Sequence, residues 1–235
     1  ERSERLIDVQ QMSKIYNEGR ENEVRALDNI SLSVRWGEFL CILGQSGSGK
    51  STLMNILGCL DIPTYGTYYL DGQPVSDMKP SVLAGIRNRE IGFIFQGFNL
   101  IPALTAIENV ELPLIYRGVG KKERRELAEA ALEKVGLGQR MSHKPSEMSG
   151  GQQQRVAIAR AIAQAPPVIL ADEPTGNLDS GSTKEIMSIL KQLHREGRTV
   201  ILITHDNDIA AQARRVIRIK DGKIEADFEQ QVEDW

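Results

Sequence analysis

The sequence predicts an α/β fold with a parallel core sheet, an N-terminal antiparallel β-layer and an inserted helical subdomain. Two short, continuously apolar runs, 39–43 and 168–171, are typical of strands buried on both faces of a parallel sheet. Residues 26–34 alternate between apolar and polar side chains, as in a half-buried antiparallel strand. Residues of about 98–165 have a helical character instead. These three patterns together favour layers of helices around a central sheet.

The first hundred residues contain the predicted β-layer and the start of the core. Residues 5–16 and 26–34 are expected strands, and the charged segment 17–25 between them is expected at a hairpin tip. A helix should begin near Lys50 and end near Gly58, and a second hairpin should span 66–75 around the Asp71-Gly72 turn. Another buried strand is expected over 91–95.

The rest of the chain alternates helices with strands. Residues 121–135 form a charged helix with one apolar face, and 151–165 form a second helix rich in alanine. The strand 168–171, the helix 181–193, the strand 199–204 and a hairpin over 216–224 follow. We therefore expect one domain over 1–235, in which 1–97 and 166–235 form the core and β-layer and about 98–165 form the helical subdomain.

Composition excludes several classes of protein. A chain of 235 residues with 40% hydrophobic and 26% charged residues is long enough for one large domain. Its net charge of −3 argues against a dedicated nucleic-acid binder. No apolar stretch approaches the roughly 18 residues of a membrane span, and Glu1–Arg5 precedes no signal-peptide core. Cys41 and Cys59 are isolated, which favours small buried residues in a reducing compartment.

The segment Gly44-Gln45-Ser46-Gly47-Ser48-Gly49-Lys50-Ser51 has the pattern of a phosphate-binding loop. It follows a predicted buried strand and opens a predicted helix, which is the context that this motif requires. Its glycines let backbone N–H groups surround an anion at the positive end of the helix. Lys50 would reach the outer phosphates, and the hydroxyl of Ser51 would bind Mg²⁺.

Asp172 and Glu173 follow a predicted parallel strand, whose carboxyl end faces the ligand crevice. Asp172 would hold the metal, and Glu173 would act as the general base that activates water. An acidic pair here can also cap a helix, but the phosphate loop favours the nucleotide role. His205 and Gln96 also stand at strand ends, where we expect a contact to the terminal phosphate and to the metal and water respectively.

These residues, taken in order, resemble the ATP-binding cassette (ABC) ATPases, a type of P-loop NTPase, over essentially the whole chain. The family's hallmarks match Tyr16, the phosphate loop, Gln96, the signature loop Ser149-Gly150-Gly151-Gln152, Asp172-Glu173, Asn177-Leu178-Asp179 and His205. The signature loop and the residues after it are the most specific of these. One departure is Met148, where the family usually has leucine, and the similar volume predicts little effect.

The resemblance implies a role for each matching residue. Tyr16 would stack on adenine, Gln96 would contact Mg²⁺ and respond to a membrane partner, and His205 would be the switch histidine. Asp179 would cross a dimer interface. Ser149, Gly150, Gly151 and Gln152 would grip the terminal phosphate of ATP bound to a second copy of the chain. The implied nucleotide-binding set also contains Gly44, Gln45, Ser46, Gly47, Ser48, Gly49, Lys50, Ser51 and Thr52.

A closer resemblance is to the macrolide-exporter and lipoprotein-release ATPases. It depends on segments such as 91–96, 108–114 and 170–180. It implies an ATP-dependent homodimer, a multi-span permease as a separate or fused chain, an extracytoplasmic adaptor, and a place at the cytoplasmic face of a bacterial membrane. We expect an apolar groove for a helix of the permease, lined by Phe98, Leu100, Ile101, Leu104 and Leu114. Plain core packing is the alternative for those five residues.

Two other functions remain open at this point. A soluble ABC ATPase that acts on DNA or ribosomes would carry a long coiled coil or a second cassette, and the chain has neither. A binding module without hydrolysis is disfavoured by the intact Glu173. The start at Glu1 in place of methionine indicates a fragment or a trimmed chain, and the acidic end Glu229–Trp235 is either a natural end or a cut before a fused membrane domain.

Overall fold

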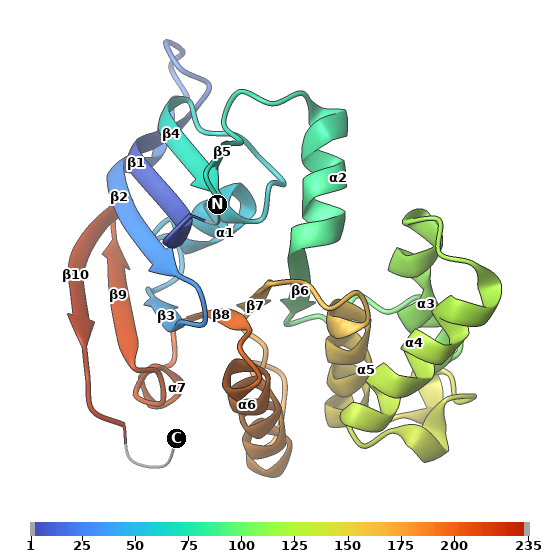
Figure 1. Ribbon diagram of the computed structural model, residues 1–235. Coiled ribbons are helices and arrows are strands. Elements are labelled where there is room, and N and C mark those ends of the chain that lie inside the picture. The colour runs from blue at the N-terminus through green and yellow to red at the C-terminus, as the bar shows by residue number, and fades with distance from the viewer. Residues whose placement is uncertain (1–2, 233–235) are drawn as a thin grey trace.

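The computed structural model describes residues 3–232 and consists of two sheets with helices around them (Figure 1). The smaller, antiparallel sheet has the strand order β2-β1-β4-β5. Its strands are β1 (Arg5–Tyr16), β2 (Val24–Arg35), β4 (Tyr65–Leu70) and β5 (Gln73–Pro74). The predicted N-terminal β-layer is therefore present, and its two hairpins turn at 17–23 and at Asp71-Gly72. Of the predicted acidic end Glu229–Trp235, the last three residues lie outside the described part.

The larger sheet has six strands in the order β10-β9-β3-β8-β7-β6. The five strands from β9 to β6 are parallel, and β10 pairs with β9 in the antiparallel sense. The bounds are β3 (Phe39–Leu43), β6 (Ile91–Phe95), β7 (Val168–Asp172), β8 (Thr199–Thr204), β9 (Arg215–Lys220) and β10 (Lys223–Glu229). The prediction of a parallel core sheet is confirmed.

Helices cover both faces of this sheet. One face carries α1 (Lys50–Leu57) and α2 (Pro80–Glu90) together with the antiparallel sheet. The other face carries α6 (Ser180–Arg195) and α7 (Asn207–Ala210), and the bundle of α3 (Ala106–Tyr116), α4 (Lys121–Lys134) and α5 (Gly150–Ile162) lies at the β6 end (Figure 1). Two short 3₁₀ turns, Gly138–Arg140 and Pro145–Glu147, connect α4 to α5.

The alternation of side chains along β3 explains why the apolar run is continuous. Phe39, Cys41 and Leu43 face the core shared with α3–α7, whereas Leu40 and Ile42 face the core beneath the antiparallel sheet. Successive side chains of a strand point to opposite faces, so a strand that is covered on both sides must be apolar throughout. The two Cys residues are both buried, as predicted.

Two helices differ from the sequence-based interpretation. Helix α2 was not predicted, because its apolar residues are few and a proline at its first turn, Pro80, reads as a loop. Helix α3 was expected only as part of a helical region, since Pro113 lies inside it. The division of the chain at residues 98 and 165 stays a prediction. Within residues 3–232, no helix has both the length and the hydropathy to cross a membrane.

Candidate nucleotide-binding site

The predicted phosphate loop connects β3 to α1, at the carboxyl edge of the parallel sheet. Its shape requires glycine at two positions. A Cβ on Gly44 would lie 2.4 Å from Oγ of Ser48, and a Cβ on Gly49 would lie 2.5 Å from the carbonyl oxygen of Ala26. Gly49 also has a φ of 101°, which side chains disfavour. The backbone N–H of Gly222 donates to the carbonyl of Ser48 at 2.8 Å and fixes the loop from outside.

The loop and the start of α1 together fit an anion. In the part of the chain that the structure describes, no side chain caps the N-terminus of α1, and no acidic residue lies in its first turn. The free N–H groups of that turn therefore give a positive end. Lys50 is only 9% exposed, and Oγ of Ser48 is buried without a hydrogen-bond partner among the described residues. A buried hydroxyl without a partner, beside a buried cation and free N–H groups, fits a phosphate as the missing partner.

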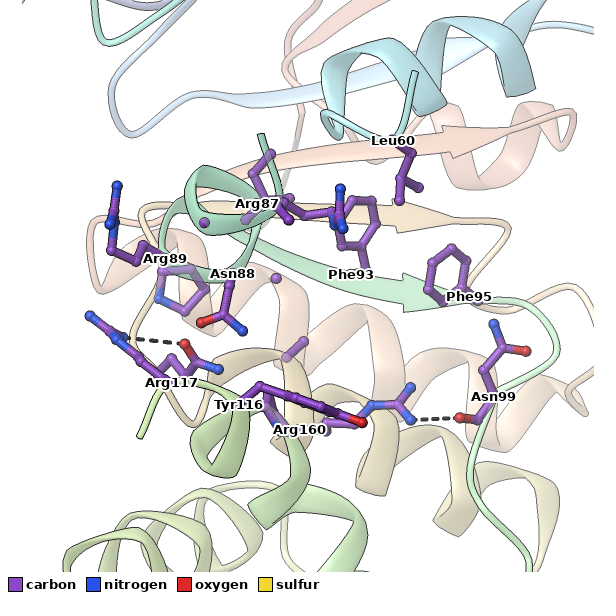
Figure 2. Close-up of a pocket in the computed structure, with 18 residues that line it drawn as sticks. Leu60, Arg87, Asn88, Arg89, Phe93, Phe95, Asn99, Tyr116, Arg117 and Arg160 are labelled. Atoms are coloured by element: carbon purple, nitrogen blue, oxygen red, sulfur yellow. Dashed lines mark hydrogen bonds between the residues drawn. The ribbon is translucent and has the colours of Figure 1, made fainter. Parts of the chain in front are cut away.

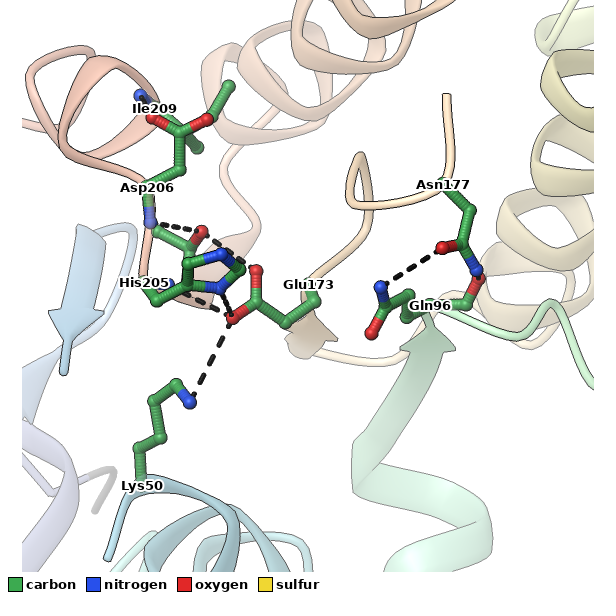
Figure 3. Close-up of polar contacts among 8 residues, drawn as sticks. Lys50, Gln96, Glu173, Asn177, His205, Asp206 and Ile209 are labelled. Atoms are coloured by element: carbon green, nitrogen blue, oxygen red, sulfur yellow. Dashed lines mark hydrogen bonds and ion pairs between the residues drawn. The ribbon is translucent and has the colours of Figure 1, made fainter. Parts of the chain in front are cut away.

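Glu173 lies at the centre of a polar cluster at the ends of β7 and β8 (Figure 3). Its Oε1 lies 3.9 Å from Nζ of Lys50, accepts from the backbone N–H of His205 at 3.0 Å and lies 2.6 Å from Nδ1 of His205. Its Oε2 accepts from the hydroxyl of Thr204 at 2.9 Å. The fold thus brings together three of the predicted catalytic residues: Lys50, Glu173 and His205.

Asp172 is the last residue of β7, next to Phe95 of β6 and Ile203 of β8 in the sheet. Burial raises the pKa of its carboxyl, the nearby charge of Glu173 raises it further, and Lys50 opposes both effects. A cation beside Asp172 would favour its charged form. The hydroxyl of Ser51, the amide of Gln96 and this carboxylate are the oxygen donors that Mg²⁺ prefers, so these residue types fit the predicted metal.

Gln96 pairs with Asn177, a contact that the sequence did not suggest. Its Nε2 donates to Oδ1 of Asn177 at 3.2 Å, and Nδ2 of Asn177 donates back to the carbonyl of Gln96 at 3.3 Å. Figure 3 shows this pair beside the Glu173 cluster and separate from it. A Cβ on Gly176 would lie 2.6 Å from Nε2 of Gln96, so glycine lets the amide lie against this loop. Gln96 is therefore linked to the segment that leads to Asp179.

Tyr16 ends β1 with its side chain 37% exposed. Its hydroxyl donates to Oδ2 of Asp61 at 3.3 Å, and Nζ of Lys14 lies 5.1 Å from the centre of its ring. Lys14 also pairs with Asp61 at 2.8 Å, so the three side chains form one cluster. The ring is held in place and still has exposed surface, which fits the predicted stacking on a base.

The signature loop Ser149–Gln152 opens α5. Ser149 caps the helix by accepting from the backbone N–H of Gln152 at 3.2 Å, and the side chain of Gln152 accepts from the N–H of Ser149 at 3.1 Å. Gly151 allows α5 to approach α6 closely, because a Cβ there would lie 2.5 Å from Oγ of Ser182. Asp179 caps α6 through Ser182 at 3.0 and 2.8 Å.

The fold does not bring the signature loop to the phosphate loop of the same chain. A Cβ on Gly150 would meet the side chains of Leu178 and Phe98, and a Cβ on Gly151 would meet that of Ser182. Figure 1 shows α1 near the antiparallel sheet and α5 in the bundle with α3 and α4, with α2 and β6 drawn between them. The two predicted halves of the phosphate site, the phosphate loop and the signature loop, are thus separate within one chain.

A cleft of about 860 Å³ lies between α2, β6, α3 and α5 (Figure 2). Aromatic side chains of Phe93, Phe95 and Tyr116 line it, and Tyr116 is 83% exposed. Four arginines also line it, and of these Arg160 is held by the carbonyls of Phe98 and Asn99 at 2.9 and 2.6 Å. The four are Arg87, Arg89, Arg117 and Arg160.

The five residues predicted for an apolar groove, Phe98, Leu100, Ile101, Leu104 and Leu114, lie outside this cleft. Leu114 is 1% exposed, and Leu100 packs against the core of the α3–α5 bundle. The buried Asn109 binds the backbone of Ile101, Leu104 and Thr105 and holds this loop against α3. For Phe98, Leu104 and Ile101, which is 43% exposed, the groove stays a prediction. Core packing, the alternative for these residues, describes Leu114 and Leu100.

Sequence reasoning missed the roles of two polar residues of the site, Gln154 and Thr204, and one pairing. Asn177 was recognised in its motif, but its pairing with Gln96 was not. Gln154 is fully buried, and its amide donates to the carbonyls of Phe95 and Pro174 at 3.1 and 2.6 Å. It therefore links α5 to the segments that carry Gln96 and Glu173. The sequence feature that could have identified Thr204 is a hydroxyl residue at the end of an apolar strand, immediately before His205.

Comparison with known proteins places these features in one family. Residues 27–176 match the family model described as ABC transporter. A macrolide export ATP-binding/permease protein, MacB of Hyphomonas neptunium, is 56% identical over 222 residues, which is 94% of this chain and 34% of that protein. The ABC transporter ATP-binding protein YvrO of Bacillus subtilis is also 56% identical over 222 residues, which is 94% of this chain and 96% of YvrO.

Solved structures agree with this likeness. A dimeric structure of the ATP-binding cassette MJ0796, in a post-hydrolysis state with ADP and Pi, has a TM-score of 0.87 and 47% identity. It covers 97% of this chain and 100% of that chain. The chain spans about a third of the length of the MacB relatives that it matches and nearly all of YvrO. The chain belongs to the ABC transporter family and is an ATP-binding, ATP-hydrolysing domain of that family.

Proposed function

We propose that this chain powers a membrane exporter or mechanotransmission complex of the macrolide, peptide or lipoprotein type. It would do so through an ATP-driven, head-to-tail dimer of its ATPase domain. The observation that carries the dimer is the separation of the signature loop from the phosphate loop within one chain. The dimeric structures of MJ0796 and the name of the MacB relatives support the proposal.

The nucleotide would be held by the elements at the carboxyl edge of the parallel sheet. Tyr16 would stack on the base, and the loop from Gly44 to Gly49 would surround the phosphates with its N–H groups. Lys50 would contact the outer phosphates, and the hydroxyls of Ser51 and Thr52 lie in the first turn of α1 beside them. Ser48 would satisfy its buried hydroxyl on the same phosphates.

Hydrolysis would use the cluster around Glu173. Its carboxylate would accept a proton from the attacking water, and His205 would contact the terminal phosphate from the end of β8. Gln96, which follows β6, would leave Asn177 to orient the water and the metal. Mg²⁺, held by Ser51, Gln96 and Asp172, would neutralise the charge that develops on the phosphates.

The second half of each site would come from the partner copy. Ser149 caps α5, and the glycines after it leave the helix N-terminus open to a phosphate of the other chain. Asp179 lies in the same region, at the start of α6, and would cross the interface. Two such chains that close on two ATP molecules would complete both sites at once.

The cleft beside β6 is the proposed docking site for a cytoplasmic helix of a multi-span permease, either fused or separate. Its aromatic floor suits an apolar helix face, and its four arginines suit acidic residues on that helix. Phe95, which lines the cleft, immediately precedes Gln96 in the chain. A docked helix would therefore contact the segment that carries Gln96. The chain would then lie at the cytoplasmic face of a bacterial cell membrane, with an extracytoplasmic adaptor as a further partner.

The test of this function is the variant Glu173→Gln. Without a carboxylate to accept the proton, ATP turnover should fall about 10²-fold or more, because general-base catalysis contributes that much. ATP binding should persist, and the ATP-bound dimer should accumulate. Phosphate release and size-exclusion chromatography with ATP measure the two effects. Glu129→Gln, on the exposed side of α4, is the matched control. Unchanged turnover in Glu173→Gln would sink the general-base role.

A further inference from the structure

Thr204 ends β8, immediately before His205, and is 2% exposed. Its hydroxyl donates to Oε2 of Glu173 at 2.9 Å, and its oxygen accepts from the backbone N–H of Asp206 at 3.0 Å. We propose that Thr204 is a positioning residue that holds the carboxylate of Glu173 in its working orientation during ATP hydrolysis. This inference rests on the proposed role of Glu173 as the general base.

The two oxygens of Glu173 have different kinds of partner. Oε1 faces Lys50 and His205, which in the proposed function turn to the phosphates of ATP. Those two side-chain contacts must therefore weaken when the nucleotide binds, and Oε1 then keeps only the backbone N–H of His205 at 3.0 Å. Oε2 faces Thr204, which is buried at the end of a central strand. The hydroxyl of Thr204 is thus the side-chain contact that can persist while a lone pair of Oε1 becomes free to accept a proton.

The backbone of Glu173 depends on the same strand. Its N–H donates to the carbonyl of Ile203 at 2.8 Å, so β8 holds both ends of this residue. Its φ is +46°, in the left-handed region that non-glycine residues rarely adopt. Such a conformation persists only when its surroundings fix it. Ile203 fixes the main chain, and Thr204 fixes the side chain.

The central experiment exchanges the hydroxyl for a methyl group of the same shape. In Thr204→Val, kcat for ATP hydrolysis should fall about tenfold or more with the KM for ATP unchanged, because a hydrogen bond to a charged group is lost. Thr204→Ser keeps the hydroxyl and should restore kcat to near the wild-type value. Thr204→Ala removes the hydroxyl with less bulk and replaces the valine variant if that variant does not fold.

Thr199→Val is the matched control, because it makes the same exchange at the other end of β8. Thr199 is fully buried, and its hydroxyl accepts from the backbone N–H of Gly37 at 2.9 Å, far along the strand from Glu173. Thr199→Val should lower the melting temperature as Thr204→Val does and leave kcat unchanged. Equal loss of kcat in the two variants would assign Thr204 a structural role only.

A double-mutant cycle separates this inference from the function on which it rests. If Thr204 acts through Glu173, then adding Thr204→Val to Glu173→Gln should cause no further loss of single-turnover rate. Losses that multiply would overturn the inference, as would a rise in KM with kcat unchanged or a failure of Thr204→Ser to restore kcat. An active Glu173→Gln overturns the general base itself. A dead Glu173→Gln with a fully active Thr204→Val overturns only the role of Thr204.

Discussion

The two cysteines of this chain show how burial in the core changes the pKa of a single residue. Cys41 lies in β3, where burial and then the charge of Glu173 raise the pKa of its thiol to about 12. Burial likewise raises the pKa of the Cys59 thiol to about 11, with a small opposing effect from Arg87. Only the thiolate is nucleophilic. Both residues are therefore protected from reagents, because burial blocks access and the raised pKa keeps the thiol protonated.

We expect both thiols to resist alkylation by iodoacetamide at pH 8 in the folded chain and to react once it is unfolded in guanidinium. Tyr116→Cys, at a position that is 83% exposed, is the positive control and should react in the folded state. Mass spectrometry after a timed reaction gives the number of labelled thiols. Rapid labelling of Cys41 in the folded chain would contradict the buried strand.

The same shifts predict a dependence of stability on pH. Each thiol has a folded pKa above its ordinary value of 9.0, so the folded state keeps its proton to a higher pH than the unfolded state does. This contribution to stability is complete below pH 9 and is lost as the pH rises towards the folded values.

At the residue scale, sequence motifs predicted most residues of the polar cluster around Glu173, and the structure showed their remaining partners. Lys50, Glu173 and His205 could be predicted because each stands at the end of a recognisable strand or loop. The partner of Gln96 could not, since Asn177 approaches it only through the folded loop after β7. Thr204 was missed because a single hydroxyl after an apolar run has no pattern of its own until Glu173 is placed beside it.

Strands and helices could be predicted from the sequence where their hydrophobic pattern was strong. β3, β6, β7 and β8 were predicted within a residue or so at each end, because a strand buried on both faces must be apolar throughout. Helix α2 was missed because its inward face has only two buried residues, Leu83 and Ile86. That helix forms one wall of the arginine-lined cleft, so this cleft could not be located from the sequence.

The cleft between α2, β6, α3 and α5 gives the prediction at this scale. Tyr116→Ala removes an exposed ring from its rim, and Arg89→Glu reverses a charge on its α2 wall. Each should weaken co-purification with a separate membrane subunit about tenfold, because aromatic and arginine residues dominate such contacts. Basal ATP turnover of the isolated chain should not change.

Leu127→Ala is the control for this prediction, because Leu127 is an exposed apolar residue of α4 outside the cleft. It should leave co-purification intact. Full retention of the membrane subunit by both Tyr116→Ala and Arg89→Glu would show that the helix docks elsewhere.

On the scale of the whole molecule, the proposed dimer uses the N-termini of α1 and α5 in different sites. α1 begins at Lys50 beside Glu173, whereas α5 begins beside α6 and Leu178. In the proposed function, one chain would carry half of each of two sites, and a head-to-tail pair would carry two complete ones. This arrangement predicts that damage to the two halves can be complemented between chains.

The variants Lys50→Ala and Gly151→Asp test the shared site directly. The first removes the phosphate contact of α1, and the second places a carboxylate where a phosphate should bind and where even a Cβ would meet Ser182. Each variant alone should have two damaged sites and little turnover.

In a mixed dimer, the phosphate loop of the Gly151→Asp chain meets the intact signature loop of the Lys50→Ala chain, so one site is whole. An equal mixture should recover up to about a quarter of the sites, by random pairing in a two-fold dimer. Binding of radiolabelled ATP and phosphate release measure the recovery. The control is a mixture of Lys50→Ala with Lys50→Ala,Gly151→Asp, which has no whole site in any pairing. A mixture of the two single variants no better than this control would mean that each chain completes its own site.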